Sequence, residues 1–106
     1  MVKHLIVFNV SAEVSKESCL AMADQAREEL MRIPGVTGVS FGVAVAENAS
    51  YRYLMIIDFA DEEVIDFYRD HPIHVRFADE VFRPMAVHRI TTDYSMVFLE
   101  VCDGPG

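Results

Sequence analysis

The first ten residues alternate in a way that predicts a β-strand. Successive side chains of a strand point to opposite faces, so Val2 and His4 share one face with the apolar residues that follow at every second position. Leu5 and Val7, on the other face, are apolar too. A strand with apolar residues on both faces is typical of the interior of a sheet that is covered on both sides. We therefore expect a central strand over 2–10.

Two segments show the three- and four-residue spacing of apolar positions that indicates amphipathic helices. The first covers 15–33, where Ser15 can cap the helix and a Pro-Gly pair ends it. The second begins after the acidic residues at 61–63, which suit the electropositive start of a helix. Pro72 must break this helix or restart it, so we expect a second helical piece over 72–82.

Three more segments return to the two-residue period of strands. They cover 39–46, 51–59 and 87–96, and a polar turn at 47–50 joins the first two into an antiparallel pair. The strand over 39–46 has one bulky face and one face of small side chains, which leaves room for something to approach. The residues at 97–101 form an apolar extension of the last strand.

The order strand-helix-strand-strand-helix-strand predicts an α+β fold of the ferredoxin-like class, with helices on one face of an antiparallel sheet. The 106 residues suffice for a single domain, in which 96–106 are a strand-like apolar extension and tail. Because the first three strands carry apolar residues on both faces, the uncovered face should pack against a second copy. The mean hydropathy of +0.20 agrees with such a homodimer.

The charge balance disfavours several classes of partner. Seventeen acidic and nine basic residues give a net charge of −8, the wrong sign for binding nucleic acid or an anionic membrane. The apolar runs are far shorter than the roughly 20 residues of a membrane helix. The start of the chain resembles ordinary structure more than a leader, so we expect a cytoplasmic protein. Cys19 and Cys102 lack metal-ligand spacing, and we expect two reduced thiols.

Two motifs in combination suggest a family. Val-Lys-His opens the first strand at 2–4, and Tyr-Arg-Asp-His-Pro-Ile-His-Val stands at 68–75. With Ile-Pro-Gly-Val at 33–36 and Asp-Phe at 58–59, the chain resembles the stress-responsive dimeric A/B barrel family from Val2 to about Tyr94. The resemblance implies a homodimeric α+β barrel with a cleft between sheet and helices in each subunit. It leaves the function open, because the family includes plant stress proteins, an aromatic polyketide cyclase and many uncharacterised bacterial members.

Three residues are candidates for catalysis. His4 suits a general base, because an imidazole titrates near neutral pH, although a buried His can instead donate a structural hydrogen bond. The resemblance to the cyclase members implies that His4 works with Tyr68 and His74 at a ligand pocket. Ala26 stands where the cyclase has a pocket tyrosine, which implies a cavity of different shape.

His71, Phe41 and Phe77 are candidate ligand contacts. The alternative for His71 is to cap the second helical piece, and the alternative for the aromatic residues is to fill the core. His71 and His74 do not predict a metal site, since HExxH and Cys-pair motifs are absent and Pro72 interrupts the helical spacing. Nucleotide-binding, dinucleotide-binding and serine-nucleophile motifs are also absent from the sequence, and we expect no cofactor.

These side chains permit acid–base chemistry without a cofactor on a small, partly apolar molecule of aromatic or polyketide-like character. Ring closure by a cyclase or lyase, or an isomerisation, would fit. The first alternative is a non-catalytic stress-responsive or assembly scaffold, in which the apolar segment 96–101 adds a strand to a neighbour. The second alternative is a cofactor-free monooxygenase on a related fold.

Overall fold

Strands and helices follow the predicted order in a computed structural model, which describes residues 1–99. The elements are β1 (Val2–Val10), α1 (Lys16–Leu30), β2 (Val36–Val43), β3 (Tyr53–Phe59), α2 (Glu63–Asp70), α3 (Pro72–Phe77), the π-helix η1 (Ala78–Phe82) and β4 (Ala86–Ser95). This order confirms the expected ferredoxin-like α+β fold. No helix within these residues is long and apolar enough to cross a membrane.

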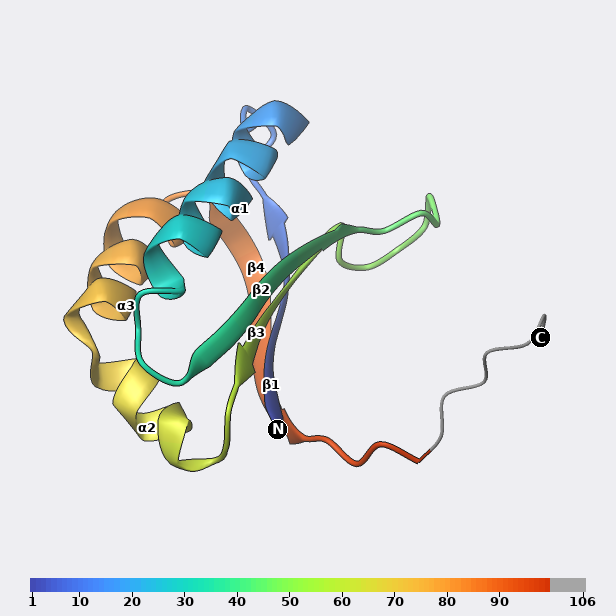
Figure 1. Cartoon of the computed structure of the whole chain (residues 1–106). Helices are drawn as coiled ribbons and strands as arrows, with labels where there is room; N and C mark the ends of the chain where they lie inside the picture. The colour runs from blue at the N-terminus through green and yellow to red at the C-terminus, as the bar shows by residue number, and fades with distance from the viewer. Residues whose placement is uncertain (100–106) are drawn as a thin grey trace.

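The four strands form one antiparallel sheet in the order β2-β3-β1-β4, so β1 is central as expected. All helices lie on one side of the sheet, which leaves the opposite face open (Figure 1). The register places His4 opposite Ile57 on β3 and opposite Asp93 on β4. These three side chains therefore project toward the helices from three neighbouring strands.

The core fills the space between the sheet and the helices. Phe8 of β1 meets the edge of Phe82 in η1 with ring centroids 5.0 Å apart. Burial of each such side chain contributes about 2 kcal/mol to folding. The largest fully buried side chains are Phe8, Phe59, Leu30, Ile33, Met55 and Ile57.

β2 begins and ends three residues earlier than the period-two pattern predicts. The alternation over 39–46 continues in the sequence beyond the end of the strand. The strand ends early because Arg52 holds the following residues in a loop. Its guanidinium donates to the carbonyls of Ala44, Ala46 and Glu47 at 2.9 to 3.0 Å. These carbonyls leave the ladder, and the strand ends at Val43.

The second helical region divides at Pro72. His71 adopts an extended conformation with ψ 134°, as the residue before a proline prefers. The chain then enters α3, and the helical turns end in η1 rather than in a continuous α-helix over 72–82. His71 caps α3, because its Nδ1 accepts the Ile73 N–H at 3.1 Å.

The expected extension beyond β4 lies partly outside the described residues. Cys102 lies outside them altogether. The described part, residues 96–99, is here called the apolar arm. Met96 donates its N–H to the carbonyl of Met1 at 3.0 Å, and the chain then leaves the sheet. Val97, Phe98 and Leu99 have exposed fractions of 75%, 68% and 91%. The arm is thus unpaired within this chain beyond Met96, not a continuation of the strand.

We predict that Gly35→Ala destabilises the fold by about 2 kcal/mol, because Gly35 has φ 93° and an added Cβ would lie 2.6 Å from a Val64 methyl. Gly42→Ala is the control, since its Cβ would meet Leu54 only at an ordinary 3.8 Å. Urea unfolding measures both. Equal free energies of unfolding for the two variants would contradict the expected strain at Gly35.

Candidate functional site

His4 is held by a carboxylate from the neighbouring edge strand. Its Nδ1 lies 2.5 Å from Oδ1 of Asp93, and only 14% of its side chain is exposed. Because the carboxylate accepts, Nδ1 carries the proton of this hydrogen bond. The imidazole also stacks on Phe59 with a centroid distance of 5.6 Å. Backbone register and side-chain contacts together fix its orientation.

Tyr68 lies between two imidazoles. The centroid of its ring is 5.5 Å from that of the His4 ring and 4.2 Å from that of the His74 ring. The residue is 3% exposed. Burial, followed by the nearby Asp93 carboxylate, raises the pKa of the Tyr68 phenol, so the group stays protonated and can donate. Within residues 1–99 its hydroxyl has no hydrogen-bond partner, yet the oxygen is not sealed from the neighbouring space.

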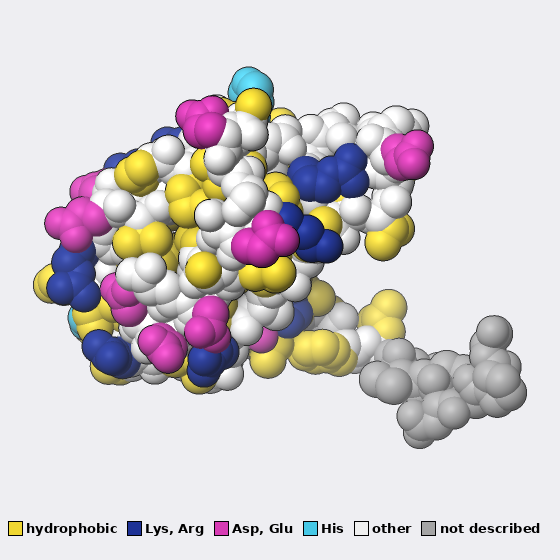
Figure 2. All heavy atoms as spheres, turned by 90° about the horizontal axis from the view of Figure 1, so that it is seen from above, with side chains coloured by type: hydrophobic (Ala, Val, Ile, Leu, Met, Phe, Trp, Pro, Cys, Tyr) yellow, Lys and Arg dark blue, Asp and Glu magenta, His cyan; other side chains and the backbone are white. Residues whose placement is uncertain are grey.

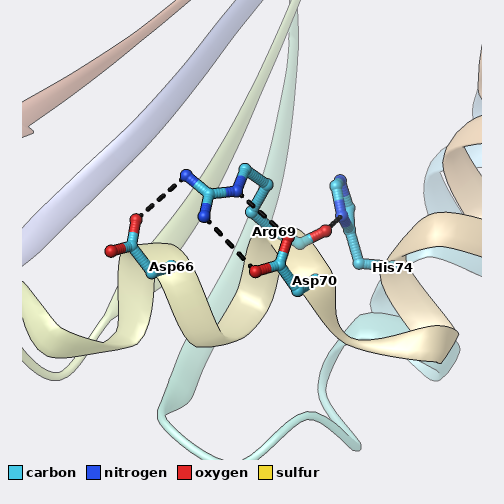
Figure 3. A network of polar contacts seen from close by, with 4 residues as sticks. All are labelled: Asp66, Arg69, Asp70 and His74. Atoms are coloured by element: carbon cyan, nitrogen blue, oxygen red, sulfur yellow. Dashed lines mark hydrogen bonds and ion pairs between the residues drawn. The ribbon is translucent and has the colours of Figure 1, made fainter.

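His74 owes its position to the break at Pro72. In a continuous helix the Arg69 carbonyl would accept the N–H of Ile73, but this N–H is bound to His71. The Arg69 carbonyl instead accepts from Nδ1 of His74 at 3.0 Å (Figure 3). Since a carbonyl only accepts, Nδ1 carries the proton here too, and Nε2 keeps a lone pair.

Desolvation lowers the pKa of His74, and the nearby His4 and Arg83 act in the same direction. The hydrogen bond to the Arg69 carbonyl opposes this shift without cancelling it. His74 is therefore neutral at pH 7, and its Nε2 is available to accept a proton.

Arg69 forms part of the rim of the site. Its guanidinium lies between Asp66 and Asp70, with nitrogen–oxygen distances of 3.0 Å and 3.1 Å (Figure 3). All three side chains are mostly exposed, so these ion pairs contribute little to stability. They hold the side chain of Arg69 along α2.

The imidazoles and the phenol border a cavity of about 260 Å³. A second void of about 20 Å³ lies behind Tyr68 and His74, next to Phe77, and has room for about one water molecule. Of these two spaces, the outer cavity has room for an organic molecule. Its lining consists of His4, Phe59, Ile65, Tyr68, Arg69, His74, Thr91 and Asp93.

The structure brings together the three residues of the expected catalytic group, but none of the three expected ligand contacts lines the same cavity. Phe77 borders only the small inner void. His71 faces Phe67 on the outer side of the helices, with ring centroids 5.5 Å apart. Phe41 stacks on Tyr53 at 5.7 Å and does not reach the cavity.

Asp93 is the functional residue that sequence reasoning did not identify. It lies in the predicted fourth strand, 89 positions from His4. A carboxylate inside a strand was the only local signal, and the register that places it opposite His4 is a property of the folded sheet. Within the described residues, no cluster of three or more His, Cys, Asp or Glu side chains is arranged to hold a metal ion.

We predict that His74 makes folding stability depend on pH. Its pKa is lower in the folded protein than the usual 6.5, so the unfolded chain binds the proton first as the pH falls. The free energy of unfolding should therefore decrease as the pH falls through about 6.5 toward the folded pKa. His74→Asn, whose amide can still donate to Arg69, should weaken this decrease between pH 7.5 and 5.5.

Urea unfolding at both pH values measures the effect. His88→Asn is the control, because His88 is exposed on β4, and it should retain the pH dependence of the wild-type protein. The same dependence in His74→Asn and in the wild-type protein would contradict the prediction.

Comparison with solved structures shows that the fold recurs widely. An Arabidopsis thaliana protein is 23% identical with a TM-score of 0.84, over 95% of this chain and 100% of that one. A dimeric ferredoxin-like protein of unknown function from Thermobifida fusca is 20% identical with a TM-score of 0.74, over 90% of each chain. A hydroxynitrile lyase from Passiflora edulis is 13% identical with a TM-score of 0.76, over 92% of this chain and 96% of the enzyme.

A comparison with curated proteins gave no match. The family model of the stress responsive A/B barrel domain, in contrast, matches residues 2–96. This match covers all four strands and every helix of the structure. The chain therefore belongs to the stress responsive A/B barrel domain family.

Proposed function

We propose that the cavity beside His4, Tyr68 and His74 binds a small, partly apolar molecule that carries a carbonyl or hydroxyl group, and that these residues perform acid–base chemistry on it. Aromatic and polyketide-like molecules fit this description. The expected reactions are ring closure or bond cleavage next to a carbonyl, or isomerisation, without a cofactor.

The observation that carries the proposal is the hydroxyl of Tyr68. A phenol hydroxyl that faces a cavity and is bound by no protein group is free to donate a hydrogen bond to a ligand. The Tyr68 residue is 3% exposed, and within residues 1–99 its hydroxyl makes no hydrogen bond, but its oxygen is open to the neighbouring space and the residue lines the cavity. A ligand oxygen in the cavity would accept this hydrogen bond.

The two imidazoles complete the acid–base set. Nε2 of His4 would take a proton from a carbon or oxygen of the ligand, and Asp93 would stabilise the imidazolium that forms. Tyr68 would donate to the ligand oxygen as negative charge develops on it. His74, neutral at pH 7, would accept or return a proton at a second position.

The fold alone does not select this chemistry. The Passiflora edulis neighbour is a lyase, whereas other neighbours have no known function, and similar folds host unrelated activities. Support comes from the side chains of the cavity. Phe59 and Ile65 offer apolar surface, and polar groups line the same cavity.

Tyr68→Phe tests the proposed site, with benzoylacetone, a phenyl-substituted 1,3-diketone, as the probe. Removal of an unpartnered hydroxyl should change the free energy of unfolding by less than about 0.5 kcal/mol. The loss of a hydrogen bond to the diketone oxygen should weaken binding about five- to tenfold. Calorimetric titration measures the affinity, and urea unfolding measures the stability.

Tyr94→Phe is the matched control, because Tyr94 lies on the other face of the sheet and should bind the probe like the wild-type protein. The double variant with alanine at His4 and His74 should lose binding further. Unchanged affinity in both Tyr68→Phe and the double variant would exclude this site.

We also propose that the chain forms a homodimer through its open sheet face. This face carries Leu5 and Val7 of β1 beside Leu54 and Ile56 of β3, all only partly buried within one chain. Antiparallel sheets commonly bury one such face against another layer. The Thermobifida fusca neighbour, which shares the fold, is described as dimeric.

Ile56→Lys should convert the dimer to a monomer, because a charge at the centre of this face would be buried without a partner. Val75→Lys, at an exposed position of α3, should remain dimeric. Sedimentation velocity measures both. A dimer that survives Ile56→Lys would place the interface elsewhere.

A further inference from the structure

We propose that the apolar arm, residues 96–99, docks on a second copy of this chain and clasps the open sheet face of its partner. This inference rests on the homodimer proposed above and adds to it a segment that lies beyond the family domain. The family model ends at residue 96, so Val97, Phe98 and Leu99 lie outside the part of the chain that it describes.

The direction of the arm supports a partner on the open face. In Figure 1 the helices lie on one side of the sheet, whereas the arm and the β2–β3 hairpin both project to the other side. Seen from above, the hairpin and the arm flank a hollow beside the body of the molecule (Figure 2). A second copy seated on the open face would lie between these two projections.

The hairpin is already ordered for such a contact. Arg52 binds three carbonyls of the loop, and Asn9 accepts from the N–H of Arg52 and donates to the carbonyl of Ser50. Val45 nevertheless presents its side chain with 99% exposure. The loop therefore holds its shape without covering its own apolar side chain.

The charge distribution on the open face permits a second copy as the occupant. Two chains of net charge −8 repel each other, so they can meet only where the surface is free of uncompensated acid. Among the described strand residues that point to the open face, the charged side chains are Lys3 and Asp58. These two form an ion pair at 2.7 Å, which leaves the face neutral.

The arm, like the open face, is apolar and carries no net charge. Its four residues are uncharged and apolar, and the last three are more than two-thirds exposed in the single chain. Leu5, Val7 and Ile90 offer apolar surface on the open face. Because the arm leaves its own sheet after Met96, a two-fold dimer would bring each arm to the partner.

The test compares two double variants that carry the same added charge. Phe98→Glu with Leu99→Glu changes the arm. Phe67→Glu with Leu20→Glu replaces one Phe and one Leu of 49% and 48% exposure on the helices that cover the other face. We expect the arm variant to raise the dimer dissociation constant at least about tenfold, and the helix variant to change it less than about twofold.

A wild-type protein that is monomeric at all concentrations would overturn the proposed homodimer itself. A wild-type dimer whose dissociation constant is the same in the arm variant would overturn only the role of the arm. Sedimentation velocity over a concentration series distinguishes these outcomes. Circular dichroism and urea unfolding of both variants verify that the chains fold.

A second experiment identifies what the arm touches. The photoreactive analogue p-benzoylphenylalanine replaces Phe98, and the irradiated protein is analysed by intact mass. Crosslinked chains of twice the 12.0 kDa mass, joined at open-face residues such as Leu5, are the expected result. Crosslinks within single chains only would show that the arm folds back on its own sheet and would overturn the proposal.

Discussion

The structure depends on the antiparallel pairing of β1 with β3 on one side and with β4 on the other. This pairing fixes which residues face the helices, because a slip of one position would exchange the two faces of the strand. One face gives His4 to the cavity and its apolar neighbours to the core. The other face gives Leu5 and Val7 to the open side of the sheet. The candidate site and the proposed interface thus share a single strand.

Proline chemistry assembles the other half of the site. Pro72 forces His71 into an extended conformation, which ends α2 and leaves the Arg69 carbonyl without its helical donor. The imidazole of His74 takes the place of that donor. A constraint on the backbone therefore positions the side chain and fixes the tautomer of the ring in the same step.

The sequence predicts those parts of the fold that depend on local periodicity. The alternation of 2–10 identified the central strand and the inward face of His4, and the break at Pro72 was visible directly. Asp93 was not predictable, because its contact with His4 depends on a register between strands that are remote along the chain. The early end of β2 was missed for a similar reason, since Arg52 closes the loop through carbonyls that carry no sequence signal.

The sheet order also determines when the site is completed during synthesis. The ribosome makes β1 first, yet its partners β3 and β4 appear only about 50 and 85 residues later. A strand that is apolar on both faces must wait for both neighbours, and unpaired strand edges of this kind are prone to aggregate. The contact between His4 and Asp93 spans 89 positions and is among the last that a nascent chain can form. The paired imidazole of His4 therefore forms only when β4 completes the sheet.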